Sequence, residues 1–183
     1  LRMSRGLGDV YKRQVQPQDA DAIRNDGFTN VIPIEEIKTI DGISIYRTTG
    51  HHGFGQIGQM MGPVSGYVLK AEGFPTVYIM GDCRWEACIR DTVERFNPDY
   101  IVVNSGGAIF PEFSKTDGPI IPDENEVMQI LDELPSHIKL IAVHMDAIDH
   151  CQTTRAILRN EATHHEADMS RLIIPEDGET VVL

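Results

Sequence analysis

The stretch TVYIMGDCRWEACIRDTVERFNPDYIVV, residues 76–103, decides the fold class. It begins and ends with short apolar runs of strand length, residues 76–80 and 100–103. Between them, residues 85–96 carry apolar side chains at helical spacing. A strand, a helix and a strand in succession are typical of the α/β class, in which sites form at the carboxyl ends of the strands.

The other predicted elements are short, and no repeat or long linker separates them into two domains. They are a helix at 16–25, strands at 30–34, 43–48, 64–71 and 138–143, and helices at 124–134 and 153–162. Asp41-Gly42 and Glu72-Gly73 are predicted tight turns that begin or join strands. Residues 53–62 are predicted as a loop, either an apolar lid over a site or a segment whose methionines pack on the hairpin.

Two histidines and one aspartate lie where three of these strands should end. They are His52 in TTGHHG (48–53), Asp82 in IMGDC (79–83) and His144 in IAVHMDAIDH (141–150). A lone histidine or aspartate at a strand end is usually structural, but the three together suggest a common site. Imidazole nitrogen and carboxylate oxygen are ligands for Zn²⁺, Mn²⁺ and Fe²⁺, and a carboxylate can bridge two ions.

These motifs, together with GPVSGY at residues 62–67, resemble the metallo-β-lactamase-fold hydrolases, in particular the ascorbate-6-phosphate lactonase-like branch. The resemblance implies an αββα sandwich that holds two divalent ions, Zn²⁺ or Mn²⁺. His52 would bind the first ion, Asp82 would bridge both and His144 would bind the second. Asp82 and His144 would thereby serve catalysis by a metal-bound hydroxide.

The H-x-H-x-D-H cluster of that family is absent from this sequence. We therefore expect residues 15–183 to be the C-terminal part of an incomplete αββα sandwich that lacks its N-terminal strands. With three ligands in place of about seven, the chain alone is expected to bind metal weakly and to be inactive. The lost strands would leave an apolar sheet face and open edges.

Residues 1–14 are interpreted as a sequencing-adapter artefact. The sequence DVYKRQ at 9–14 is what the transposase end used in library construction encodes, and no helix or strand period runs through it. The segment is excluded from fold reasoning for that reason.

Four further residues are candidates for supporting the ligands or contacting substrate. Asp146 and His150 follow His144 closely and could orient its imidazole or shuttle a proton. Asn104 begins the turn NSGG, whose amides either face substrate or only form a glycine turn. His51 is either a surface residue or a support for the site.

The composition narrows the functional classes. The 183 residues, 41% hydrophobic and 24% charged, are typical of one globular domain, and no apolar run approaches the length of a membrane span. A net charge of −12 disfavours nucleic acids and anionic membranes as partners. Three cysteines without metal-finger spacing favour a reducing, cytoplasmic location.

The expected function is therefore hydrolysis of an ester, lactone or phosphate-ester-like bond in a small molecule, carried out by the full-length protein. A phosphodiesterase or nuclease on the same fold is one alternative, which the acidic composition disfavours. A non-catalytic binding protein that has lost its upstream ligands is another. The sequence leaves open whether the protein forms a homo-oligomer.

Overall fold

The computed structural model describes residues 13–112 and 117–183. The predicted artefact at residues 1–14 therefore lies, for residues 1–12, outside the described residues. The described part contains, in chain order, β1 (Arg13–Val15), a 3-10 helix (Pro17–Asp19), α1 (Ala20–Asn25), β2 (Val31–Pro33), β3 (Ile37–Ile40), β4 (Ile43–His51), α2 (Gly55–Met61), β5 (Pro63–Lys70), β6 (Val77–Gly81), α3 (Ala87–Phe96), β7 (Tyr100–Asn104), α4 (Glu124–Glu133), β8 (Lys139–Val143), α5 (Arg155–His164) and β9 (Leu172–Ile173).

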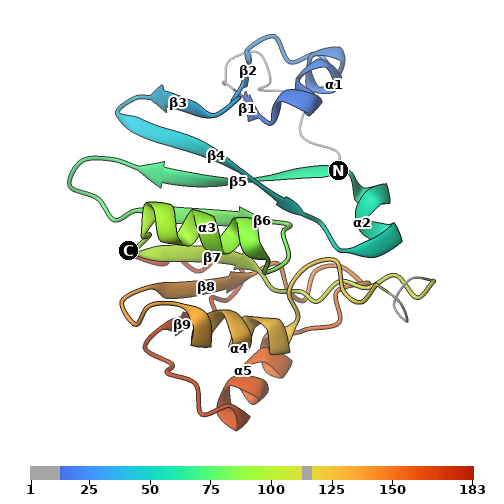
Figure 1. Ribbon diagram of the computed structural model, residues 1–183, viewed down its shortest axis with the longest axis vertical. Coiled ribbons are helices and arrows are strands. Elements are labelled where there is room, and N and C mark those ends of the chain that lie inside the picture. The colour runs from blue at the N-terminus through green and yellow to red at the C-terminus, as the bar shows by residue number, and fades with distance from the viewer. Residues whose placement is uncertain (1–12, 113–116) are drawn as a thin grey trace.

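A mixed sheet in the order β3-β4-β5-β6-β7-β8-β9 forms the centre of the structure (Figure 1). Strands β3 to β6 pair antiparallel, as hairpins do, and β6 to β9 pair parallel. The change falls at β6, where the sequence pattern changes from hairpins to alternating strands and helices. The predicted α/β class is confirmed, and a separate two-stranded parallel sheet joins β1 to β2.

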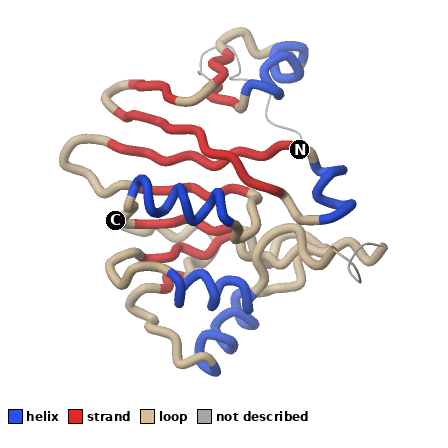
Figure 2. Tube along the Cα trace, viewed as in Figure 1, coloured by secondary structure: helices blue, strands red, loops and turns tan. Residues whose placement is uncertain are grey.

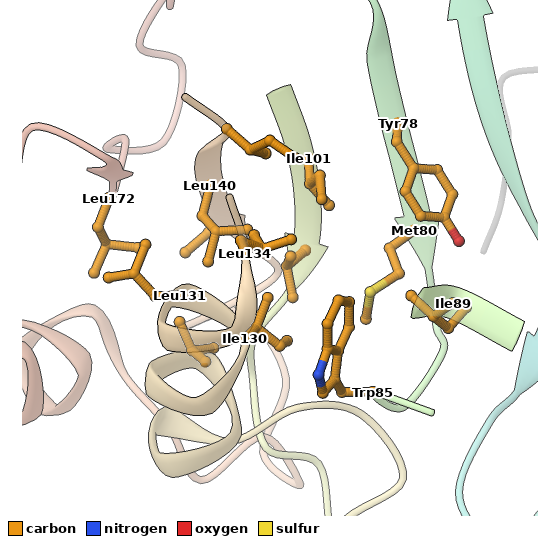
Figure 3. Close-up of a cluster of buried hydrophobic side chains, with 14 of the residues drawn as sticks. Tyr78, Met80, Trp85, Ile89, Ile101, Ile130, Leu131, Leu134, Leu140 and Leu172 are labelled. Atoms are coloured by element: carbon orange, nitrogen blue, oxygen red, sulfur yellow. The ribbon is translucent and has the colours of Figure 1, made fainter. Parts of the chain in front are cut away.

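The two faces of the sheet differ in how they are covered. Helices α3 and α4 lie over the same face, as the helices drawn in blue show (Figure 2). Tyr78, Met80, Ile101 and Leu140 point into the core on that face, together with residues of both helices (Figure 3). This cluster contains most of the buried apolar residues of the described chain, and their burial stabilises the fold.

The alternate residues of the same strands do not join that core. Val77, Tyr100 and Val102 are half-buried and Ile79 is 37% exposed, whereas Ile141 on β8 is buried. We call this second side the open face. It carries apolar side chains, and the expectation that lost strands once covered it stays a prediction.

Several elements differ from the sequence-based expectation. Residues 55–61, predicted as part of a loop, form helix α2. The last long helix begins at Arg155, because Thr154 caps it by accepting a hydrogen bond from the Ile157 amide. The short edge strands β3 and β9 were not predicted either. No helix among the described residues is long and apolar enough to span a membrane.

Candidate metal centre

The predicted ligands all follow strands that end at the same edge of the sheet. His52 comes directly after β4, Asp82 after β6 and His144 after β8, while Asn104 is the last residue of β7. These four strands run in the same direction, since β4 and β6 both pair antiparallel with β5. Helix α2 and the loops after β7 and β8 gather on this side of the sheet (Figure 1).

Gly81 and His144 have unusual backbone conformations. Gly81, just before Asp82, has φ 72°, and a Cβ there would lie 2.8 Å from the Ser65 carbonyl oxygen. Only glycine fits this turn, which directs the Asp82 carboxylate away from the strand. His144 has φ 64°, a left-handed conformation that is rare outside glycine. Such conformations persist where the surrounding structure holds them, often at functional sites.

The charges of Asp82, His144 and His150 all act on His52. Burial lowers the pKa of His52; Asp82 opposes that shift, and His144 and His150 add to it. The structure therefore brings the three predicted ligands and His150 into one electrostatic neighbourhood. A lowered pKa keeps the His52 imidazole neutral at neutral pH, which is the form that binds metal.

Neighbouring side chains orient two of the ligands. Asn104 Nδ2 donates a hydrogen bond of 2.6 Å to Asp82 Oδ1. His144 Nδ1 lies 3.8 Å from Cys151 Sγ, which leaves Nε2 as the nitrogen available to a ligand. The backbone at Gly106 packs closely on this pair, because a Cβ there would lie 2.4 Å from the His144 carbonyl oxygen. Asn104 thus contacts a candidate ligand directly, as a supporting residue would.

The other three candidate residues have different surroundings. His150 stacks on Phe110 with a ring separation of 5.3 Å. Asp146 Oδ2 accepts hydrogen bonds from the Arg155 amide at 3.1 Å and from Arg155 Nη1 at 2.7 Å, so it ties the loop to α5. His51 is exposed and pairs with Glu86 at 2.8 Å. A role in catalysis stays a prediction for all three.

The ligand set is incomplete within the described residues. Its chemistry, two imidazoles and a carboxylate, suits Zn²⁺ or Mn²⁺. However, in the part of the chain that the structure describes, no three His, Cys, Asp or Glu side chains converge closely enough to hold an ion. These residues can therefore contribute to a metal centre but do not form one alone.

A cavity of about 380 Å³ opens beside Asp82. Its polar wall includes Ser65, Tyr67 and Asn104, and its apolar wall includes Ile23 and Val64. This size and mixed lining suit a small molecule. The cavity lies on the side of Asp82 where the N-terminal helix α1 contributes to the wall.

No family model matches the chain. The UPF0173 protein YddR of Bacillus subtilis (strain 168) is 32% identical over 164 residues, which are 88% of this chain and 62% of YddR.

Several solved structures share the fold. A possible metal-dependent hydrolase from Veillonella parvula DSM 2008 aligns with a TM-score of 0.85 and 31% identity, over 93% of this chain and 66% of that one. An isothiocyanate hydrolase from Delia radicum gut bacteria aligns with a TM-score of 0.84 and 33% identity, again over 93% and 66%. The metallo-β-lactamase fold protein YhfI from Bacillus subtilis aligns at 0.51 with 16% identity, over 80% and 56%.

These alignments show that the chain has the metallo-β-lactamase fold. They also show that it spans 62% of the length of YddR and 66% of each of the two more similar solved chains.

Sequence reasoning did not identify several residues that shape the site. Cys151 contacts His144, Phe110 stacks on His150, and a buried pair, Arg84 and Glu126, lies behind the loop that carries Asp82. Cys151 could have been suspected from its place next to His150. The other contacts join residues far apart in the chain, and no local pattern signals them.

Proposed function

We propose that this chain, which has the metallo-β-lactamase fold, provides part of the active site of a metal-dependent hydrolase of small molecules. The observation that carries the proposal is the placement of His52, Asp82 and His144 at one sheet edge, with His52 under the electrostatic influence of the other two. Two proteins more than 30% identical to it are named as hydrolases, one of them a possible metal-dependent hydrolase, which supports the same reading.

Each of the three residues would serve as a metal ligand. His52 would bind through a neutral imidazole, Asp82 would be the ligand shared by two ions, and His144 would bind through Nε2. The hydrogen bond from Asn104 holds the Asp82 carboxylate in a fixed orientation, as supporting residues around metal ligands commonly do. When bound, two such ions supply an activated water and stabilise negative charge developing on the substrate. The remaining ligands would come from a further segment of a longer protein, one that corresponds to the portion of the relatives that this chain does not span.

The proposed substrate carries an electrophilic carbon or phosphorus centre, in an ester, lactone or phosphate ester. An isothiocyanate, the substrate in the name of one solved relative, also presents an electrophilic carbon to water and belongs to the same proposal. The cavity beside Asp82 limits the substrate to a small molecule. Three free cysteines fit a cytoplasmic location, which is part of the proposal.

Two alternatives differ in what they require. A phosphodiesterase or nuclease would need a basic surface to hold its substrate, which the net charge of −12 disfavours. A non-catalytic binding protein would keep the fold and the cavity but would bind no metal. The codons that precede Val15 in the source DNA bear on this second alternative, since an H-x-H-x-D-H cluster encoded there would favour the hydrolase.

Metal titration of the 183-residue chain tests the proposal directly. Zn²⁺ or Co²⁺ should bind weakly, and Asp82→Asn and His144→Ala should each weaken binding at least tenfold, since each removes a proposed ligand. His165→Ala is the control, because His165 pairs with Asp132 rather than with the site. Equal binding by all four proteins would contradict the proposal.

Activity is tested on the longer protein, once its upstream sequence is recovered. A lactone, a phosphodiester and an isothiocyanate are offered in turn, with and without a chelator. Chelator-sensitive turnover of one of them supports the hydrolase and names the substrate class. No turnover, together with no metal binding, would favour the binding protein.

A further inference from the structure

We propose that Glu126 and Arg84 position the loop carrying Asp82 against the loop carrying His52, and thereby set the spacing of these two residues before any metal binds. Neither residue is a candidate ligand. The inference rests on the proposed metal site for its consequence, but the loop contact itself can be tested without metal.

Both carboxylate oxygens of Glu126 accept hydrogen bonds from the residues that follow Asp82. Glu126 lies in the first turn of α4 and is 8% exposed. Oε2 accepts a hydrogen bond of 2.5 Å from Arg84 Nε, and Oε1 accepts one of 2.6 Å from the Trp85 amide. Because one bond goes to a side chain and the other to the backbone, Glu126 restrains both the position and the direction of this loop.

Arg84 carries that restraint to the loop of His52. Its backbone amide donates a hydrogen bond of 3.0 Å to the carbonyl oxygen of His51. Its guanidinium lies 5.1 Å from the centre of the Phe54 ring. Arg84 therefore contacts the chain on both sides of His52. Nη1 also donates to the Pro119 carbonyl, which adds the segment before α4 to the same assembly.

Two further contacts hold the same loops together. The His51 amide donates a hydrogen bond of 2.8 Å to Glu86 Oε1. At Gly50, a Cβ would lie 2.5 Å from Cys83 Sγ, so these two segments pack too closely to admit a side chain at position 50. The loops of His52 and Asp82 are thus in contact along their length, and Glu126 is the member of this contact that anchors it to a helix.

The buried pair of Arg84 and Glu126 is better explained by its effect on the orientation of the Asp82 loop than by its contribution to stability. Burial raises the pKa of Glu126 despite the opposing effect of Arg84, so the folded protein bears a cost for the charge. Buried ion pairs often contribute no more to stability than apolar side chains of similar volume. An arginine–carboxylate pair is strongly directional, because the planar guanidinium donates hydrogen bonds in only a few geometries.

Helix α4 offers a matched control seven residues further on. Glu133 also pairs with an arginine, Arg90 Nε at 2.7 Å, and also accepts a hydrogen bond from Trp85, here from Nε1 at 2.6 Å. This second pair is exposed, with 40% of the Arg90 side chain and 36% of the Glu133 side chain accessible. It joins α4 to α3 without touching the loop of His52.

The test compares Glu126→Gln with Glu133→Gln by amide hydrogen exchange, without metal and well below the melting temperature. Glu126→Gln should speed exchange of the Trp85 amide about tenfold or more, because its hydrogen bond then lacks the charged acceptor. Exchange of the Arg84 amide should also rise, because its hydrogen bond to the His51 carbonyl depends on the loop position that Glu126 holds. Glu133→Gln should leave these amides within about twofold of the parent chain. Arg84→Lys keeps the positive charge but loses the several fixed N–H donors of the guanidinium, so its amide exchange should resemble that of Glu126→Gln.

A Co²⁺ titration of the same proteins tests the consequence for the site. Glu126→Gln and Arg84→Lys should weaken Co²⁺ binding about tenfold, the loss typical of residues that orient metal ligands, and should shift the visible absorption of the bound ion. Glu133→Gln should change neither.

The outcomes separate the two proposals. Equal exchange in Glu126→Gln and Glu133→Gln, or unchanged exchange in both, overturns the positioning role. The expected exchange pattern with no Co²⁺ binding by the parent chain supports the loop contact and overturns the proposed metal site. If Glu126→Gln fails to fold, Arg84→Lys decides the question by the same two measurements.

Discussion

Glu126 and Glu133 show how strongly burial decides the behaviour of a single side chain. Both lie on α4, seven residues apart, and both pair with an arginine. Burial raises the pKa of Glu126, whereas hydrogen bonds from Arg90, Gln129 and Trp85 lower the pKa of the exposed Glu133 to about 2. The same residue type therefore costs stability at neutral pH in one place and adds a little in the other.

The exposed pair of Arg90 and Glu133 leads to a prediction about how stability depends on pH. The pKa of Glu133 is lower in the folded chain than in the unfolded chain, so its contribution is complete above the unfolded value and is lost as pH falls towards about 2. Glu133→Gln should therefore lower the free energy of unfolding at pH 7, by about 1 kcal/mol or less because solvent screens the pair. Urea unfolding at pH 7 and pH 3 checks this. A difference from the parent that does not shrink at pH 3 would be inconsistent with the ion pair as its source.

Among the elements, α2 depends on tertiary packing for its existence. It has seven residues, three fewer than α3, α4 or α5. Helices this short are marginal in water. Ile57 is 3% exposed and packs in a small cluster with Ala108, Ile120 and Ile121, while its amide donates to Asp117. Helix α2 thus joins the end of the His52 loop to the segment before α4.

Helix α2 yields a prediction with an internal control. Ile57→Ala should lower the free energy of unfolding by about 2–4 kcal/mol, because it opens a cavity in the small cluster. Met60→Ala, on the same helix, should cost less than about 0.5 kcal/mol, because Met60 is 66% exposed. Urea denaturation of both variants measures the difference. Equal effects would mean that α2 is not held by this cluster.

At the scale of the whole molecule, the open face is the feature that most affects behaviour in solution. The core cluster takes residues from one face of the sheet only, and the alternate residues Val77, Ile79 and Val102 stay partly or largely exposed. An apolar sheet face of this kind promotes association. The same face is where further chain, present in longer relatives, could pack.

The open face predicts self-association of the isolated chain. Sedimentation velocity at tens of micromolar should show species larger than a monomer, since association would remove apolar area from water. Ile79→Lys should reduce this association, whereas Ile157→Lys, on α5, should not. The two residues are matched, being 37% and 41% exposed. A monomer at every concentration, with a sharp cooperative melt, would argue that the fold is complete without further packing.

Local sequence was sufficient to predict the strands and helices that end at the site. The strands predicted at 76–80, 100–103 and 138–143 correspond to β6, β7 and β8 to within one residue at each end, and α3 and α4 lie within two residues of their predicted bounds. His52, Asp82 and His144 could be selected as candidate ligands because the pattern of apolar residues indicates where each strand ends. Their resemblance to one fold supplied the rest of that prediction.

Contacts between distant segments were decided only by the tertiary structure. Helix α2 has glycines at Gly55 and Gly58, which disfavour a helix locally, and it forms because Ile57 has a cluster to enter. Glu126 meets Arg84 across 42 positions of sequence, and Cys151 lies against His144, which has a left-handed backbone conformation. Local propensity sets where elements begin and end, but burial and hydrogen bonding between elements determine which side chains meet, and the site depends on both.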